Sequence, residues 1–143
     1  MEPPGPVGVA RIDRTFASDP VPRFRPHEHL RRPTDFQAVY DRRRSAADGT
    51  LVVYVRENGL PHSRLGLSVS KKFGGAVVRN RIRRLMREAY RLGRDDLPTG
   101  FDLVLIPRPQ EVYALEAFRH SLPKLVKQAV KKIARDVEAP KPS

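Results

Sequence analysis

The apolar residues of this chain first fall into a regular pattern within residues 31–44. Phe36, Val39 and Tyr40 are spaced i, i+3 and i+4, which places them on one side of a helix. Thr34 follows a proline and is expected to cap that helix. The sequence therefore predicts a short amphipathic helix with an aromatic face.

Two strands are predicted next, over residues 50–57 and 64–70, because both segments alternate and the first is rich in β-branched and aromatic residues. One side of the pair is apolar and consists of Leu51, Val53, Val55, Leu65, Leu67 and Val69. The other side consists of Val52, Tyr54, Arg56, Gly66, Ser68 and Ser70. We expect one face that enters the core and a second face that is small, hydroxylated and aromatic.

Residues 101–107 form a nearly continuous apolar run, as expected of a strand covered on both sides. A final helix is predicted over residues 113–137, where apolar residues recur at helical spacing. Pro123 interrupts that pattern, so we expect a kink or a boundary near residues 120–122. The order of elements predicts an α+β fold, with one sheet and helices packed on it.

The segment between the second and third strands predicts a basic helix. Its apolar stripe, expected to pack on the sheet, is formed by Val78, Ile82, Leu85, Met86, Ala89 and Leu92. The remaining arc holds Arg79, Asn80, Arg81, Arg83, Arg84, Arg87, Glu88 and Arg91. Arginines four residues apart repel one another, so their regular stacking indicates a phosphate backbone lying along the helix.

Composition favours the same class of partner. Lys and Arg number 28 against 16 Asp and Glu, a net charge of +12 that attracts polyanions, nucleic acid first. The absence of cysteine excludes disulfides, thiolate metal sites and cysteine nucleophiles. No stretch is as long and apolar as a membrane span, and no secretory signal is visible, so a cytoplasmic protein is expected.

The chain is expected to form one domain with two tails. Half of the 14 prolines fall in the first 33 residues, which predicts a disordered Pro-rich arm over residues 1–29. A folded RNA-binding domain is expected over residues 30–137 and a disordered tail over residues 138–143.

No catalytic constellation is predicted. Asp95 and Asp96 form an adjacent acidic pair in what reads as a turn, and the histidines are isolated or lie in the arm. Gly74 and Gly75 precede the basic helix and can bring the backbone close to an anion at the helix N-terminus. The same glycines can equally form the turn alone.

The stretch RLGLSVSKKFGGAVVRNRIRRLMREAYR closely resembles the signature of the protein subunit of bacterial ribonuclease P, whose hallmark RNR segment is Arg79-Asn80-Arg81 here. DFQAVY resembles the first helix of that family, and the order of elements agrees from about Leu30 to Ile133. The resemblance implies a single-domain, two-layer α+β sandwich with a mixed central sheet and flanking helices. Its expected order is α-β-β-(β)-α-β-α, with a left-handed βαβ crossover that ordinary handedness rules would not predict.

The resemblance also implies that the protein is a non-catalytic subunit of an endoribonuclease, a hydrolase whose RNA subunit uses Mg²⁺ to remove the 5′ leader from precursor tRNA. One protein per ribonuclease P RNA is implied, and the protein broadens the substrate range. The residues matched to binding of the catalytic RNA are Lys71, Lys72, Arg79, Asn80, Arg81, Arg83, Arg84, Arg87 and Arg91. Those matched to the leader cleft are Phe36, Tyr40, Val52, Tyr54, Ser68 and Ser70.

The protein itself is expected to bind no metal stably, although it helps the complex retain metal ions and Asn80 is the candidate position for such an ion. Single-stranded RNA held by stacking on aromatic rings is consistent with the cleft, but Phe36 and Tyr40 can also be ordinary core residues. The alternatives are a ribosomal RNA-binding protein and, less well supported, a DNA-binding module that lacks a visible recognition helix.

Overall fold

The computed structural model describes residues 28–138, in which four strands form one mixed sheet in the order β1-β2-β4-β3. The strands are β1 (Arg44–Ala47), β2 (Leu51–Glu57), β3 (Arg64–Leu67) and β4 (Phe101–Pro107). β1 and β2 are antiparallel, β2 and β4 are antiparallel, and β3 and β4 are parallel. β4 therefore lies inside the sheet, which explains its nearly continuous burial.

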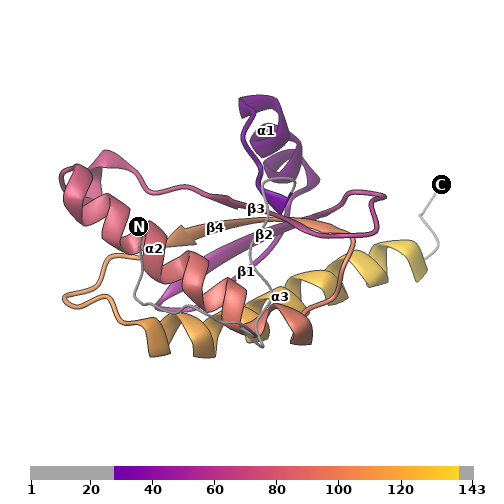
Figure 1. Ribbon diagram of the computed structural model, residues 1–143. Helices are drawn as coiled ribbons and strands as arrows, with labels where there is room; N and C mark the ends of the chain where they lie inside the picture. The colour runs from indigo at the N-terminus through magenta and orange to yellow at the C-terminus, as the bar shows by residue number, and fades with distance from the viewer. Residues whose placement is uncertain (1–27, 139–143) are drawn as a thin grey trace, which may run out of the picture.

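Three helices flank this sheet (Figure 1). They are α1 (Pro33–Arg42), α2 (Ala76–Gly93) and α3 (Leu115–Glu138), with two short 3₁₀ turns, η2 (Lys71–Phe73) and η3 (Arg94–Asp96). α1 stands over one face of the sheet, whereas α2 and α3 lie on the other (Figure 1). The predicted α+β single domain is confirmed, and the additional strand of the expected order is β1.

The two faces of the sheet have separate apolar cores. Leu51, Val53 and Val55 of β2 are fully buried toward α2 and α3, as their alternation predicted. Burying side chains of this size contributes about 1.5–3 kcal/mol each to folding. On the other face a smaller cluster forms around Val39 of α1 and Val104 of β4. The larger core holds the fold, and the smaller one attaches α1 to the sheet.

A buried carboxylate joins three strands at one end of the α1-facing side. Asp102 of β4 is completely inaccessible and accepts hydrogen bonds from Nε and Nη2 of Arg64 at 2.8 and 2.7 Å. Nδ2 of Asn58 donates to it at 2.9 Å, and Nη1 of Arg56 lies 3.5 Å away. Because a buried charge is tolerated only when it is paired and hydrogen-bonded, these partners are what make Asp102 compatible with a core strand.

Three local predictions are corrected. α1 begins after Arg32 with Pro33 in its first turn and no side-chain cap, so Thr34 is not the capping residue. The strand expected over residues 64–70 ends at Leu67, because the chain then turns into η2. The stripe of α2 packs chiefly against α3 rather than flat on the sheet, and Val78 at its start is 42% exposed.

Pro123 does not end the last helix. α3 runs continuously through it, so the boundary predicted at residues 120–122 is wrong. Leu122, Leu125 and Val126 around the proline are buried in the main core. Their packing outweighs the one backbone hydrogen bond that proline cannot donate.

The predicted crossover between the parallel strands is present as β3-η2-α2-η3-β4, and its left-handed path stays a prediction. The predicted arm and tail lie outside the described residues except at their inner ends. There, Glu28 forms an ion pair with Arg94 at 2.6 Å and His29 forms a parallel bridge with Leu65. The bridge extends the edge of the sheet beyond β3, and the ion pair joins this segment to η3.

Candidate nucleic-acid interface

The outer face of α2 carries the strongest uncompensated charge. Arg81, Arg84 and Arg87 are exposed, and none of them forms an ion pair within residues 28–138. The pKa of Arg87 is lowered by partial burial and then by the neighbouring charges of Arg84 and Arg83. Such mutual repulsion is relieved when phosphates approach, so this face is suited to a polyanion.

The other arginines of α2 are partly occupied by contacts within the protein. Nε of Arg79 donates to the carbonyl oxygen of Gly74 at 3.2 Å, and Nη1 of Arg83 donates to Oδ1 of Asn80 at 2.9 Å. Arg91 pairs with Glu88 through two hydrogen bonds. The predicted set is therefore divided: Arg81, Arg84 and Arg87 are available to a ligand, whereas Arg79, Arg83 and Arg91 also stabilise the helix.

The two lysines before the helix continue this basic surface. Lys71 and Lys72 are exposed on η2, and Nζ of Lys72 lies 5.5 Å from the centre of the Phe73 ring. Phe73 packs in turn against Tyr113 with ring centres 6.2 Å apart. A cation over an aromatic face is weakly held, so Lys72 remains accessible to a ligand, as does the exposed Lys71.

The paired glycines have different roles. Gly74 has φ +134°, and a Cβ added there would lie 3.2 Å from Cβ of Val78, so the turn itself requires glycine. Gly75 has φ −74° and nothing within 4 Å of an added Cβ. The turn hypothesis is thus supported for Gly74. At Gly75, no neighbouring atom excludes a larger side chain.

Aromatic residues from α1 and β2 meet over the face of the sheet opposite to α2 and α3. The rings of Tyr40 and Tyr54 pack edge to face with centres 5.1 Å apart. Phe36 lies directly over Gly66, where an added Cβ would come within 2.7 Å of the Phe36 ring. All three aromatic side chains are half-buried, packed against the smaller core and still partly open to solvent. The core-packing interpretation of Phe36 and Tyr40 is supported, and their contact with the leader stays a prediction.

The remaining predicted cleft residues lie further along the same side of the sheet. Val52 is half-buried and pairs with Ile106 of β4. Ser68 is half-buried just beyond β3, where its N–H donates to the carbonyl oxygen of Leu105. Ser70 is exposed at the N-cap position before η2. The structure thus groups Phe36, Tyr40 and Tyr54, whereas Val52 lies on β2, and Ser68 and Ser70 lie where the chain leaves β3 toward η2.

An open pocket of about 480 Å³ lies at the end of α1, lined by Tyr40, Asp41, Arg43, Ser45 and Tyr54. Sequence reasoning missed Asp41 and Arg43 at the end of α1 and Ser45 in β1, a strand with almost no apolar pattern. Ser45 pairs with Tyr54, and Tyr54 with Val104, so the pocket floor is one row across the strands. The run of three arginines before Ser45 was the available signal.

No group of three or more His, Asp or Glu side chains that could hold a metal ion occurs within residues 28–138. Asp95 and Asp96 are exposed on η3, and the oxygen of Asn80 already accepts from Arg83. Among these described residues, no helix is long and apolar enough to span a membrane.

A cationic helix that follows the edge strand of a mixed sheet, with aromatic residues under a short helix on the opposite face, defines a class of small basic α+β proteins. Residues 24–133 match the family model described as Ribonuclease P. The chain belongs to the ribonuclease P protein family. This membership replaces the ribosomal and DNA-binding alternatives.

Individual relatives agree with that assignment. The ribonuclease P protein component of Brevibacillus brevis is 47% identical over 102 residues, covering 70% of this chain and 81% of the relative. The solved ribonuclease P protein of Thermotoga maritima superposes with a TM-score of 0.64 at 37% identity, covering 70% of this chain and 96% of that one. The Staphylococcus aureus protein gives a TM-score of 0.61 at 32% identity, covering 74% and 94%.

Proposed function

We propose that this chain is the RNA-binding, non-catalytic subunit of ribonuclease P. In this proposal a catalytic RNA hydrolyses precursor tRNA with Mg²⁺, and the protein binds both that RNA and the 5′ leader. The main observation that supports this proposal is that Arg81, Arg84 and Arg87 are exposed on α2 without an acidic partner among the described residues. A chain that belongs to this family and concentrates charge in this way has phosphate as its natural ligand.

The catalytic RNA is assigned to the surface of η2 and α2. Lys71, Lys72 and the exposed arginines supply phosphate contacts, and Asn80 and Arg83 lie beside them as a hydrogen-bonded pair. Arginine donates from a planar fork, so it binds a phosphate with two hydrogen bonds where lysine acts as a point charge. The Mg²⁺ ions belong to the RNA in this proposal, and the protein alone holds none.

The 5′ leader is assigned to the cleft between α1 and the sheet. Phe36, Tyr40 and Tyr54 present partly exposed rings on which single-stranded bases can stack, each worth about 1–3 kcal/mol. Stacking accepts any base, so the cleft would hold many leaders and thereby broaden the substrate range. β3 leads from Gly66 directly to η2, so one RNA strand and the catalytic RNA can be bound side by side.

The test is cleavage of precursor tRNA by ribonuclease P RNA at limiting Mg²⁺, with and without this protein at one protein per RNA. We expect the protein to restore cleavage and to cut nothing alone. Tight, salt-sensitive RNA binding without any restoration of cleavage would reject the proposal. A cytoplasmic location is part of the same proposal, and a fluorescent fusion of the full chain tests it.

A further inference from the structure

We propose that Arg43 is a phosphate-binding residue of the aromatic pocket, positioned to hold the backbone of one leader nucleotide whose base packs against Tyr40 and Tyr54. This inference rests on the proposed leader cleft and adds a residue to it. It comes from three features of the Arg42-Arg43-Arg44 segment, which the sequence presents as a plain run of charge.

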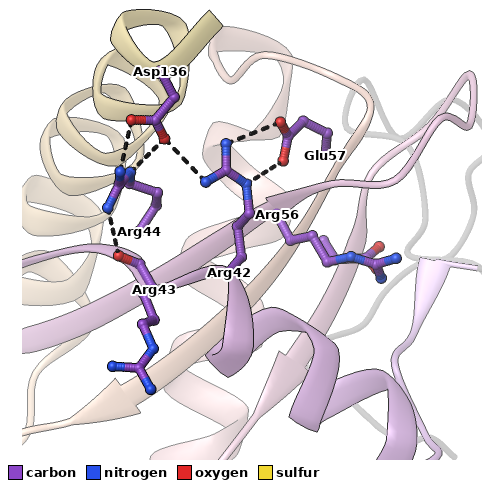
Figure 2. A network of polar contacts seen from close by, with 7 residues as sticks. Arg42, Arg43, Arg44, Arg56, Glu57 and Asp136 are labelled. Carbon is purple, nitrogen blue, oxygen red and sulfur yellow. Dashed lines mark hydrogen bonds and ion pairs between the residues drawn. The ribbon is translucent and has the colours of Figure 1, made fainter. Parts of the chain in front are cut away.

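The first feature is the division of the three arginines. Arg42 donates to both carboxylate oxygens of Glu57, at 2.9 and 3.2 Å, and to Asp136 at 3.0 Å. Arg44 donates to both oxygens of Asp136 at 2.6 Å. Figure 2 shows the guanidinium of Arg43 turned away from these acids. Within residues 28–138, no hydrogen bond or ion pair to the Arg43 side chain occurs.

The second feature is the backbone of Arg43. Its φ is +56°, and it is the one non-glycine residue with positive φ among the described residues. It closes α1 by donating its N–H to the carbonyl oxygen of Tyr40 at 3.0 Å. Glycine is the usual residue at such a helix end, because a side chain is strained there. A strained arginine where glycine would fit better indicates that the side chain is retained for a purpose other than folding.

The third feature is the pocket itself. Arg43 lines it together with Tyr40 and Tyr54, whose edge-to-face rings leave aromatic surface beside a free guanidinium. The pocket is shallow and open to solvent, so it can contact one side of a nucleotide rather than enclose it. Asp41, the acid that lines the pocket, accepts a hydrogen bond from Nε2 of Gln37 at 2.8 Å. A ring surface and a cation next to each other match the base and the phosphate of a nucleotide.

The ion pairs of Arg42 and Arg44 explain why the backbone that carries the Arg43 side chain is held in place. Arg42 and Arg44 tie the segment to β2 through Glu57 and to α3 through Asp136 (Figure 2). The residue between them has a fixed backbone, so its side chain loses less freedom on binding than an arginine on a loose loop. Glu57 and Asp136 thus pair with Arg42 and Arg44, and the charge of Arg43 remains available to a ligand.

The experiment measures equilibrium binding of the reconstituted holoenzyme to precursor tRNA with a leader and to the same tRNA without one. The readout is the Kd of the leaderless tRNA divided by the Kd of the leader-bearing tRNA. This ratio isolates the contribution of the leader to binding. Arg43→Gly is expected to reduce this ratio about three- to tenfold, the effect of one exposed charged contact. Arg43→Lys is expected to lose less, and Arg135→Ala, an exposed arginine on α3, is the matched control that keeps the ratio.

Two further measurements make the result specific. Because glycine suits φ +56°, Arg43→Gly is expected to keep or raise the melting temperature, so a loss of binding cannot be unfolding. Leaders with one phosphate replaced by a neutral methylphosphonate are then compared. At one position the replacement is expected to weaken binding of the leader to the parent holoenzyme and to leave binding to the Arg43→Gly holoenzyme unchanged. Two partners of one contact behave in this way in a double-mutant cycle.

The outcomes distinguish the proposed role of Arg43 from the assignment of the leader to the cleft. If Tyr54→Ala lowers the ratio and Arg43→Gly does not, the leader lies in the cleft without Arg43, and the inference fails alone. If neither variant lowers the ratio, the cleft assignment fails with it. An equal loss for both substrates in Arg43→Gly would place Arg43 against the catalytic RNA or the tRNA body, which also overturns the inference.

Discussion

Tyr40 of α1 and Tyr54 of β2 pack edge to face with ring centres 5.1 Å apart. This contact joins the first helix to the sheet and leaves part of each ring facing solvent. It is therefore both a packing contact and the aromatic surface of the proposed leader site. Substitutions of Tyr54 that keep or remove the ring test the second of these roles.

Tyr54→Ala is expected to weaken binding of leader-bearing precursor tRNA to the holoenzyme by about 10- to 100-fold, because it removes one stacking surface. Tyr54→Phe keeps the ring and is expected to bind within about twofold of the parent. Binding of leaderless tRNA should change little in either variant. Equal losses in Tyr54→Phe and Tyr54→Ala would mean that the hydroxyl, rather than the ring, makes the contact.

Arg81→Ala and Arg84→Ala are expected to weaken binding to ribonuclease P RNA and to flatten its salt dependence. If about five phosphates are neutralised, the log–log slope is roughly −3.5 to −4.5, and each substitution should reduce its magnitude by about 0.7 to 0.9. The measurement is Kd across a salt series.

The matched control for these variants is the double substitution Glu116→Gln with Arg119→Gln. It removes an i,i+3 ion pair from α3 without changing the net charge. The slope should stay at the parental value. A slope that falls as much in this control as in Arg81→Ala would argue against a specific role for the unpaired arginines.

Asp136→Asn is expected to destabilise the protein in a pH-dependent way. Hydrogen bonds from Arg44, opposed by some burial and reinforced by Arg42, lower the pKa of the Asp136 carboxyl from 3.8 to about 2. A lowered pKa means that the ionised carboxylate stabilises the fold above pH 3.8, and that this contribution is lost as the pH falls toward 2. The melting temperature of Asp136→Asn should lie below the parent at pH 7, and the difference should shrink below pH 4. Asp95→Asn, at an exposed residue with no ion pair among the described residues, is the control.

Gly74→Ala and Gly75→Ala are expected to differ in stability. Alanine at Gly74 meets both positive φ and Val78, at a cost of roughly 1–3 kcal/mol, whereas alanine at Gly75 should change the free energy of unfolding by less than about 0.5 kcal/mol. Urea denaturation measures both. RNA affinity of Gly75→Ala then decides its role: a loss at unchanged stability would mean that the backbone approaches a phosphate there.

The sheet strands and the faces of the helices were predictable where apolar residues repeat. Residues 101–107 match β4, and Leu51, Val53 and Val55 face the core as their alternation indicated. The burial of Tyr90 was missed, although it lies four residues after Met86 and burial raises the pKa of its hydroxyl to about 12. In β2 and β4 the local pattern and the tertiary packing agree, so the spacing of apolar residues was enough to predict which side chains are buried.

Features that depend on distant partners were not predictable. β1 contains one buried residue, Ala46, and is a strand because it pairs with β2. Asp102 reads as an irregularity in an apolar run until Arg64, 38 residues earlier in the chain, is placed beside it. The different roles of Arg42, Arg43 and Arg44 likewise depend on acids in β2 and α3. Such contacts are set by the fold, which no local window contains.

The position of β4 between β2 and β3 has a consequence for how the protein is made. Between the end of β2 at Glu57 and the start of β4 at Phe101 lie 43 residues, and β3 has no strand neighbour among the described elements except β4. During synthesis, therefore, the half that carries the cleft and the half that carries the arginine helix remain unconnected until β4 emerges from the ribosome. A nascent chain ending before Phe101 has both segments of the proposed RNA-binding surfaces but lacks the strand that joins them. Because α2 packs chiefly on α3, the arginine helix reaches its final environment only after both β4 and α3 have been made.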